Sequence, residues 1–343
     1  MLLKMRKLLL LIIVALGCRS SGYNLEIHSV LPDPEGFAGS MGAMFNEEIL
    51  LIGGSNFPNG KRPWDGGVKV WYNHIYAYQN GKWNIIGTLP EPIGYAAHDQ
   101  WNSYLVYAGG SNENGHSKKA FLLQYESGEA HVAALPDLPE TLANAVGKVV
   151  HDTFYVIGGL VHPDSMGTSN KVYSLDLNEH KASWQEKAIL PQKLMLANIA
   201  ADEDHIYVLS GTDVMDDGKR KYLNNCWKYV IHEDQWKALA SIPVPAVAGL
   251  AIYQDQRILV VGGDSGELAG VAPLKEKHPG FNGFVQILDL GTLQWSQSPI
   301  QFSNSVKGIP VTTSLVRNDE KYLILGGEVK PGIRTPQILE LTL

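Results

Sequence analysis

One short pattern occurs six times along the chain: a hydrophobic run that ends in a glycine pair or a close variant of it. The copies occupy residues 49–54, 104–110, 154–159, 206–211, 258–263 and 322–327. The pairs follow one another at intervals of 56, 49, 52, 52 and 64 residues. A repeat of about fifty residues with a double glycine is typical of a kelch-type β-propeller, in which each repeat forms a four-stranded blade. We therefore expect an all-β chain with six blades.

The residues around each copy fit the other strands of such a blade. Runs of small residues at 39–44, 143–147 and 246–251 suit the crowded centre where blades converge. Alternating runs at 73–78 and 171–176 predict third strands. A fourth strand is expected to start near a tryptophan that packs between blades. These tryptophans are Trp83, Trp184, Trp236 and Trp295.

The two ends of the chain complement each other. Residues 335–341 look like a third strand with no fourth strand behind it, and residues 24–32 look like a fourth strand with no first three before it. Pairing the two would close the ring and remove the open sheet edges that promote aggregation. Residues 23–343 are therefore predicted to form a single six-bladed domain.

Loop lengths predict which face of the propeller binds ligands. The connections between second and third strands are long at 55–72 and 264–283, whereas the opposite face has tight hairpins at 79–82 and 126–129. Long loops on one rim of a rigid scaffold usually carry the binding residues. We expect the site on the long-loop rim, over the central channel.

The N-terminus is typical of an exported protein. The chain starts with a positively charged end, formed by Lys4, Arg6 and Lys7. An apolar segment follows at residues 8–17, and it is too short to span a bilayer as a helix. Cys18 follows in a context that resembles a bacterial lipoprotein junction. We therefore expect residues 1–17 to be a signal peptide and Cys18 to be lipidated, with ordinary secretion as the alternative. The mature chain would be periplasmic or anchored to the outer membrane.

Charge and motifs argue against several classes of function. The formal net charge of −7, with no run of lysine and arginine after residue 7, makes nucleic-acid binding improbable. Cys226 lies in a strand-like setting and is expected to be a small buried hydrophobic residue rather than a nucleophile. The sequence has no Gly-x-Ser-x-Gly elbow and no paired-cysteine or His-Glu-x-x-His metal pattern. No cofactor or metal is predicted.

The sixth copy differs from the others because charged residues follow it directly. Glu328 comes immediately after the glycine pair, and Arg334 lies six residues later, across Pro331-Gly332. A turn there could direct both side chains to the channel mouth. Glu328 could then act as a base and afterwards as an acid, and Arg334 could bind a carboxylate through two parallel hydrogen bonds. An ion pair that only fixes the last loop explains the same residues equally well.

A family resemblance bears on this choice. Residues 327–335, Gly-Glu-Val-Lys-Pro-Gly-Ile-Arg-Thr, resemble a segment of the bacterial N-acetylneuraminate epimerases, the sialic acid mutarotases. Residues 53–57, 71–75 and 80–83 also resemble their glycine-rich blade. The similarity spans nearly the whole mature chain but in shifted blade order, so the chain looks like a circularly permuted branch. A closed ring tolerates permutation because any blade can host the junction. The resemblance implies a six-bladed kelch propeller exported to the periplasm.

The resemblance also implies a reaction, the cofactor-independent interconversion of the α and β anomers of N-acetylneuraminate. Glu328 would remove the proton from the anomeric hydroxyl, the sugar ring would open and then close on the other face, and Arg334 would hold the carboxylate. The sequence does not identify the proton donor to the ring oxygen. Further candidates for substrate contacts lie on the same rim. They are Asn56, Arg62, Lys69, Trp71, Tyr72 and Asn112.

Other functions are compatible with a propeller scaffold, because one fold hosts many activities. A kelch module that binds a glycan or a protein without turning it over is the main alternative. A sialidase would show repeated Ser-x-Asp-x-Gly-x-Thr-Trp boxes, and the sequence has none. A copper enzyme like galactose oxidase would need a Tyr–Cys–His set, and no suitable one is present.

Overall fold

The computed structural model describes residues 22–343, except residues 166, 180–181 and 272–273. The predicted signal peptide and Cys18 lie outside the described residues. The described chain is all-β, and its only helical segments are short 3-10 turns at Pro63–Asp65, Ile231–Glu233 and Lys275–Lys277. No helix in this part of the chain is long and apolar enough to cross a membrane.

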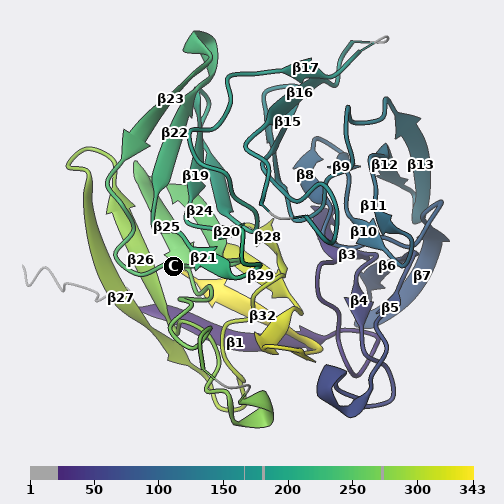
Figure 1. Cartoon of the computed structure of the whole chain (residues 1–343). Coiled ribbons are helices and arrows are strands. Elements are labelled where there is room, and N and C mark those ends of the chain that lie inside the picture. Colours follow the sequence, from purple (N-terminus) through teal and green to yellow (C-terminus); the bar gives the residue numbers. More distant parts are fainter. Residues whose placement is uncertain (1–21, 166, 180–181, 272–273) are drawn as a thin grey trace, which may run out of the picture.

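Four sheets each contain four strands in sequence order (Figure 1). The first consists of β2 (Met41–Phe45), β3 (Glu48–Ile52), β6 (His74–Gln79) and β7 (Lys82–Thr88). The second consists of β8 (Ala97–Trp101), β9 (Tyr104–Ala108), β12 (Ala120–Glu126) and β13 (Glu129–Leu135). The third consists of β14 (Val146–Val150), β15 (Thr153–Ile157), β16 (Val172–Asp176) and β17 (Gln185–Glu186). The fourth consists of β18 (Asn198–Ala201), β19 (His205–Leu209), β22 (Cys226–Val230) and β23 (Gln235–Leu239).

The remaining large sheet has eight strands and contains both ends of the described chain. Its first half is β24 (Leu250–Gln254), β25 (Arg257–Val261), β26 (Phe284–Asp289) and β27 (Gln294–Phe302). Its second half is β1 (Tyr23–Val30), β32 (Gln337–Thr342), β29 (Lys321–Leu325) and β28 (Ser314–Asn318). β1 pairs antiparallel with β32, as the sequence predicted, and its start also pairs in parallel with the end of β27. The whole arrangement is consistent with a β-propeller.

Hydrophobic residues fill the spaces between successive sheets. Six buried clusters occupy these spaces, and one of the six lies between the two halves of the eight-stranded sheet. One of them joins the two ends of the series, because Ile49 and Leu51 of β3 pack with Leu323 and Leu325 of β29. Burial of these side chains stabilises the contact between sheets far apart in sequence.

A cyclic series of backbone hydrogen bonds links the segments that immediately precede six strands. These strands are β2, β8, β14, β18, β24 and β28, and together they line a cavity that is described below. Each of six residues donates its N–H to the carbonyl oxygen of the preceding member at 2.8–3.1 Å, and the first donates to the last. These residues are Gly39, Tyr95, Asn144, Leu196, Ala248 and Thr312, and we call them the backbone ring. All six have positive φ, between 50° and 67°. Because the backbone ring takes up the first residues, three strands start later than predicted. The strands expected at 39–44, 143–147 and 246–251 start at Met41, Val146 and Leu250 instead.

The tryptophans predicted to pack between blades do lie between sheets. Each indole N–H donates to a carbonyl oxygen of a neighbouring sheet or its connection at 2.8–2.9 Å. The four pairs are Trp83 with Val30, Trp184 with Pro136, Trp236 with Ala188, and Trp295 with Ala240. Cys226 is also confirmed as a buried small residue, with 2% exposure, and burial raises the pKa of its thiol to about 12.

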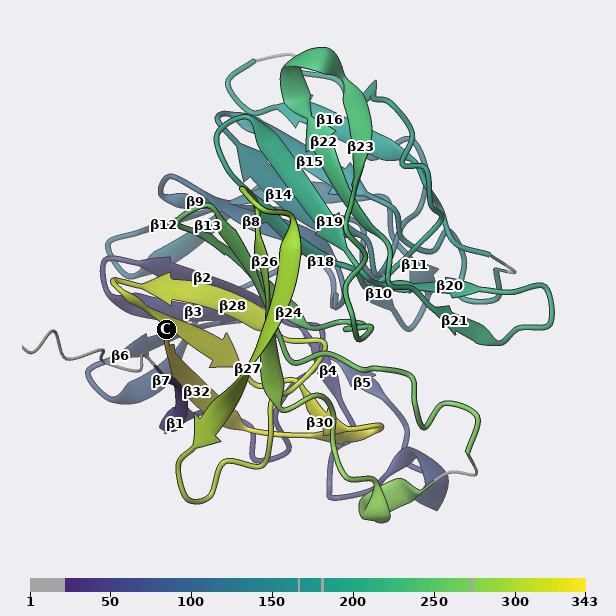
Figure 2. The same ribbon diagram turned by 90° about the vertical axis from the view of Figure 1, so that its left-hand side faces the viewer.

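Four two-stranded sheets extend from the loops that follow the hydrophobic runs. They pair β4 (Ser55–Asn56) with β5 (Val70–Trp71), β10 (Ser111–Asn112) with β11 (Gly115–His116), β20 (Thr212–Val214) with β21 (Arg220–Tyr222), and β30 (Glu328–Lys330) with β31 (Ile333–Arg334). Figure 2 shows these additions on one side of the molecule, and the hairpin between β6 and β7 on the other. The predicted candidate residues belong to this long-loop side.

Candidate functional site

The last two-stranded sheet brings Glu328 and Arg334 side by side. Glu328 of β30 and Arg334 of β31 are direct partners in the antiparallel register. Gly332 turns the chain between them with a φ of +74°, a conformation that glycine adopts without steric cost. Glu328 also exchanges two backbone hydrogen bonds of 2.8 Å with Val311, which precedes Thr312 of the backbone ring. This hairpin is therefore fixed next to the ring.

The two side chains form an ion pair that is mostly removed from solvent. Nη2 of Arg334 lies 2.9 Å from Oε1 of Glu328, and the side chains are 3% and 19% exposed, respectively. Nε of Arg334 donates to the carbonyl oxygen of Ser55 at 3.3 Å, and the guanidinium carbon lies 4.4 Å from the ring centroid of Phe57. The ion pair expected as the structural alternative is thus present.

One nitrogen of the Arg334 guanidinium makes no hydrogen bond to the described residues. Its Nη1 atom is buried and has no hydrogen-bond partner among the described residues. A buried, unpaired donor on a charged group is costly, so such groups normally have a partner. An anionic ligand would satisfy it, because a carboxylate accepts hydrogen bonds from adjacent guanidinium nitrogens.

Several candidate substrate contacts are instead occupied by contacts within the protein. Asn56 is fully buried, donates to the Gly36 carbonyl oxygen at 3.1 Å and accepts from the hydroxyl of Tyr72 at 2.9 Å. Arg62 pairs with Glu35 at 3.2 Å. These contacts fix the first long loop, residues 55–72, to the segment that precedes β2.

The side chain of Asn112 also makes its hydrogen bonds within the protein. Its Nδ2 donates to the Pro92 carbonyl oxygen at 3.2 Å, and its Oδ1 accepts from the backbone N–H of Asn114 at 2.9 Å. Asn112 therefore holds a turn of the second sheet, while Arg62 holds the first long loop. Neither contacts the Glu328–Arg334 pair through any hydrogen bond or ion pair found in the described residues.

Lys69 and Trp71 form a second group beside the pair, together with a residue that the sequence did not indicate. Nζ of Lys69 lies 5.0 Å from the ring centroid of Trp71 and 5.2 Å from that of Tyr95. Trp71 meets Tyr95 edge to face, with centroids 5.8 Å apart. Ser55 joins this group to the ion pair, because it is the register partner of Trp71 and its carbonyl oxygen binds Arg334.

Comparison with known proteins assigns the family. The sequence profile of the N-acetylneuraminate epimerase family matches residues 24–132 and 135–271. The chain belongs to the N-acetylneuraminate epimerase family. An N-acetylneuraminate epimerase of Haemophilus influenzae (strain PittEE) is 34% identical over 89 residues, which cover 24% of each chain. One of Yersinia pestis (strain Pestoides F) is 29% identical over 107 residues, 29% of this chain and 27% of the relative.

The matches leave part of the candidate site uncovered. The matched stretches span about a quarter of the length of these curated N-acetylneuraminate epimerases. The family profile ends at residue 271, so the Glu328–Arg334 hairpin lies outside it, whereas Lys69, Trp71 and Tyr95 lie inside. Membership of the epimerase family and the hairpin geometry are therefore independent observations.

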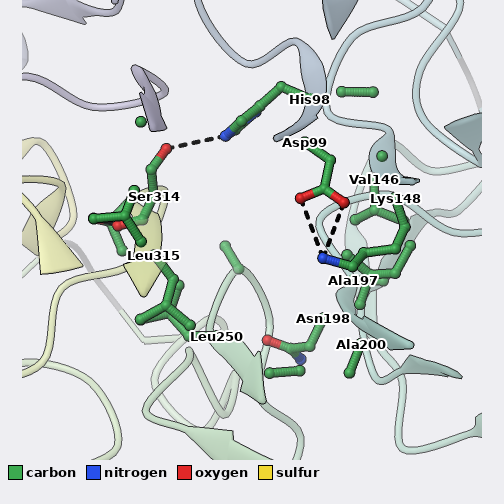
Figure 3. A pocket seen from close by; sticks show the side chains of 18 of the residues that line it. His98, Asp99, Val146, Lys148, Ala197, Asn198, Ala200, Leu250, Ser314 and Leu315 are labelled. Carbon is green, nitrogen blue, oxygen red and sulfur yellow. Dashed lines mark hydrogen bonds and ion pairs between the residues drawn. The ribbon is translucent and has the colours of Figure 1, made fainter. Parts of the chain in front are cut away.

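This epimerase-family chain contains a cavity of about 610 Å³ (Figure 3). It is lined by β2, β8, β14, β18, β24 and β28 and by the backbone ring, but not by Glu328 or Arg334. Lys148 and Asp99 form an ion pair of 3.0 Å in it, and Nε2 of His98 lies 3.2 Å from Oγ of Ser314. Burial lowers the pKa of His98. The cavity and the candidate site thus lie on different sides of the ring.

A smaller cavity, of about 400 Å³, lies outside the Pro331-Gly332 turn. Trp64, Tyr222, Asp264 and His278 line it. None of these was predicted, because they come from loops of different repeats whose proximity is set only by the fold. In the described part of the chain, no three or more histidine, cysteine, aspartate or glutamate side chains gather as metal ligands would.

Proposed function

We propose that this chain is a sialic acid mutarotase that interconverts the α and β anomers of N-acetylneuraminate. Membership of the N-acetylneuraminate epimerase family supports the substrate and the reaction class. For the scaffold we propose a single domain, residues 23–343, that forms a six-bladed kelch-type propeller closed by β1. The six inter-sheet clusters and the cyclic backbone ring support this architecture.

The unpaired Nη1 of Arg334 beside Glu328 is the observation that carries the proposal. Arg334 binds the substrate carboxylate, which is attached to the anomeric carbon. This contact places the anomeric hydroxyl next to the Glu328 carboxylate. Glu328 accepts the hydroxyl proton as the bond from the anomeric carbon to the ring oxygen breaks, and it returns a proton when the ring closes on the other face.

Substrate binding would compete with the ion pair seen here. A carboxylate bound to Arg334 offers the guanidinium a second anion, so Glu328 is no longer its only partner. Desolvation in this partly buried site strengthens each of these interactions relative to water. Lys69 and Trp71 remain the best placed of the other predicted contacts, since Asn56, Arg62, Tyr72 and Asn112 already serve the protein itself.

The proposal extends to features outside the described residues. We propose that the chain is exported to the periplasm, that Cys18 is its lipid anchor, and that it represents a circularly permuted branch of its family. No cofactor is required by the proton transfers described.

Proton NMR of freshly generated α-N-acetylneuraminate tests the proposal directly. The separate H3 signals of the two anomers report their equilibration with and without protein. We expect faster equilibration with the wild type and a rate equal to that of buffer with Glu328→Gln, which keeps the side-chain shape. A wild-type rate equal to that of buffer would refute the mutarotase. Perturbed ligand signals at that unchanged rate would support a binding module instead.

A further inference from the structure

Tyr95 is the one aromatic member of the backbone ring. Its N–H donates to the carbonyl oxygen of Gly39, and its own carbonyl oxygen accepts from Asn144. Its φ is +58°, in the left-handed region that bulky side chains rarely adopt. The neighbouring ring members Gly39 and Asn144 are of types that tolerate this conformation well. All six ring members share this conformation, so Tyr95 is set apart by its aromatic side chain and by what that side chain contacts.

The aromatic ring of Tyr95 is packed on several sides. A Cβ atom on Gly39 would come within 2.6 Å of Cδ1 of Tyr95, so the tyrosine ring rests directly on the glycine backbone. Trp71 contacts it edge to face, and the Lys69 ammonium lies 5.2 Å from its centroid. This packing limits the directions in which the hydroxyl can point.

The hydroxyl of Tyr95 points toward the residues that hold the Glu328–Arg334 pair. It lies 3.5 Å from Oγ of Ser55, at the outer limit of a hydrogen bond, and the carbonyl oxygen of Ser55 accepts from Arg334. Oγ of Ser55 donates in this contact, and the described residues offer the Tyr95 hydroxyl no closer acceptor. The proton is therefore free to be donated to a ligand bound at Arg334.

We propose that Tyr95 is the acid that protonates the ring oxygen of the sugar during ring opening; this rests on the proposed mutarotase function. Glu328 takes the proton of the anomeric hydroxyl, and the electron pair of that O–H bond forms the new carbonyl. The bond between the anomeric carbon and the ring oxygen breaks, and its electron pair takes the Tyr95 proton. The Lys69 ammonium, which lies 5.2 Å from the ring centroid of Tyr95, stabilises the phenolate. Ring closure reverses each transfer, so both groups are regenerated and no co-reactant is consumed.

Tyr95→Phe provides the test, because phenylalanine keeps the ring packing and removes only the hydroxyl. We expect the equilibration rate per protein molecule to fall about 100-fold, the scale of a lost general acid. Titration with N-acetylneuraminate should give an unchanged dissociation constant, since Arg334 and Lys69 remain. A fall in rate at an unchanged dissociation constant is a readout that a merely structural role would not give.

Tyr104→Phe is the matched control. Tyr104 begins β9 on the short-hairpin side and stacks on Trp101, which phenylalanine preserves. A wild-type rate in Tyr95→Phe, with Glu328→Gln inactive, would overturn the role of Tyr95 and leave the mutarotase standing. A wild type that does not accelerate equilibration would overturn both.

Discussion

Nη2 of Arg334 donates to Oε1 of Glu328 across 2.9 Å, while Nη1 of the same guanidinium is buried without a partner in the described residues. The hydrogen-bonding capacity of the Arg334 guanidinium is therefore only partly used. A contact that served stability alone would be expected to engage the remaining donor, since an unmet buried hydrogen bond lowers the free energy of unfolding. The geometry fits a site in which one hydrogen-bond donor of Arg334 is left unpaired until an anion binds.

The stability of the pair gives a first prediction. Glu328→Leu leaves a guanidinium that is 3% exposed without its counter-ion, and we expect the free energy of unfolding to fall by about 3–5 kcal/mol. Glu328→Gln should cost less, because its amide oxygen can still accept from Arg334. Urea denaturation measures both. The double variant Glu328→Leu/Arg334→Met should recover much of the loss, and a double variant as unstable as the sum of the single changes would contradict this.

Arg334→Lys tests carboxylate binding. An ammonium can pair with Glu328, but it cannot also reach Ser55 and present a planar donor pair to the substrate. We expect the dissociation constant of N-acetylneuraminate to rise about ten- to a hundredfold, the effect of losing one charged hydrogen bond. Isothermal titration calorimetry measures this. Arg257→Lys, at the start of β25 on the other side of the molecule, should bind like the wild type.

Much of the fold could be predicted from the sequence because it depends on local patterns. The hydrophobic runs before the glycine pairs are β3, β9, β15, β19, β25 and β29, and the orphan strands at the two ends pair as expected. Three inner strands begin two to four residues later than predicted, because small residues suit both a crowded strand and the left-handed turn ahead of it. Only the hydrogen bonds between neighbouring sheets reveal the turn.

The candidate site could be predicted less completely. Glu328 and Arg334 could be linked in advance because only five residues, which include a Pro-Gly turn, separate them. Tyr95 could not, since its neighbours Gly39, Trp71 and Ser55 come from another repeat. Likewise, the polar character of Asn56 and Arg62 suggested ligand contacts, and nothing in the sequence indicated that Gly36 and Glu35 already occupy them.

Gly39 should be sensitive to any side chain. It has a φ of +67°, and an added Cβ would meet the Tyr95 ring at 2.6 Å. Gly81 has a φ of +78° but no atom near its missing Cβ, so Gly81→Ala carries the backbone strain alone. We expect Gly39→Ala to lower the free energy of unfolding by at least about 1 kcal/mol more than Gly81→Ala. It should also slow anomer equilibration by displacing Tyr95. Equal effects of the two substitutions would show that the tyrosine is not held by this contact.

His116 gives the protein a stability that depends on pH. Burial, followed by the nearby His162, lowers the pKa of His116 to about 4, and its buried Nε2 has no partner in the described residues. In the unfolded chain a histidine has a pKa of about 6.5. The contribution of His116 to stability is therefore complete above about pH 6.5 and is lost as the pH falls toward about 4, because the unfolded state binds the proton first.

Comparison of His116→Gln with the wild type measures this contribution. Between about pH 7 and about pH 4.5, we expect the wild-type free energy of unfolding to decrease by about 1–2 kcal/mol more than that of the variant, allowing for solvent screening. Urea denaturation at the two pH values gives both differences. The buried His98 shifts in the same direction but is present in both proteins, so it cancels. His131→Gln, whose side chain is 68% exposed, is the control and should retain the wild-type pH dependence. An equal decrease in His116→Gln and the wild type would mean that His116 is protonated as readily in the folded chain as in the unfolded one.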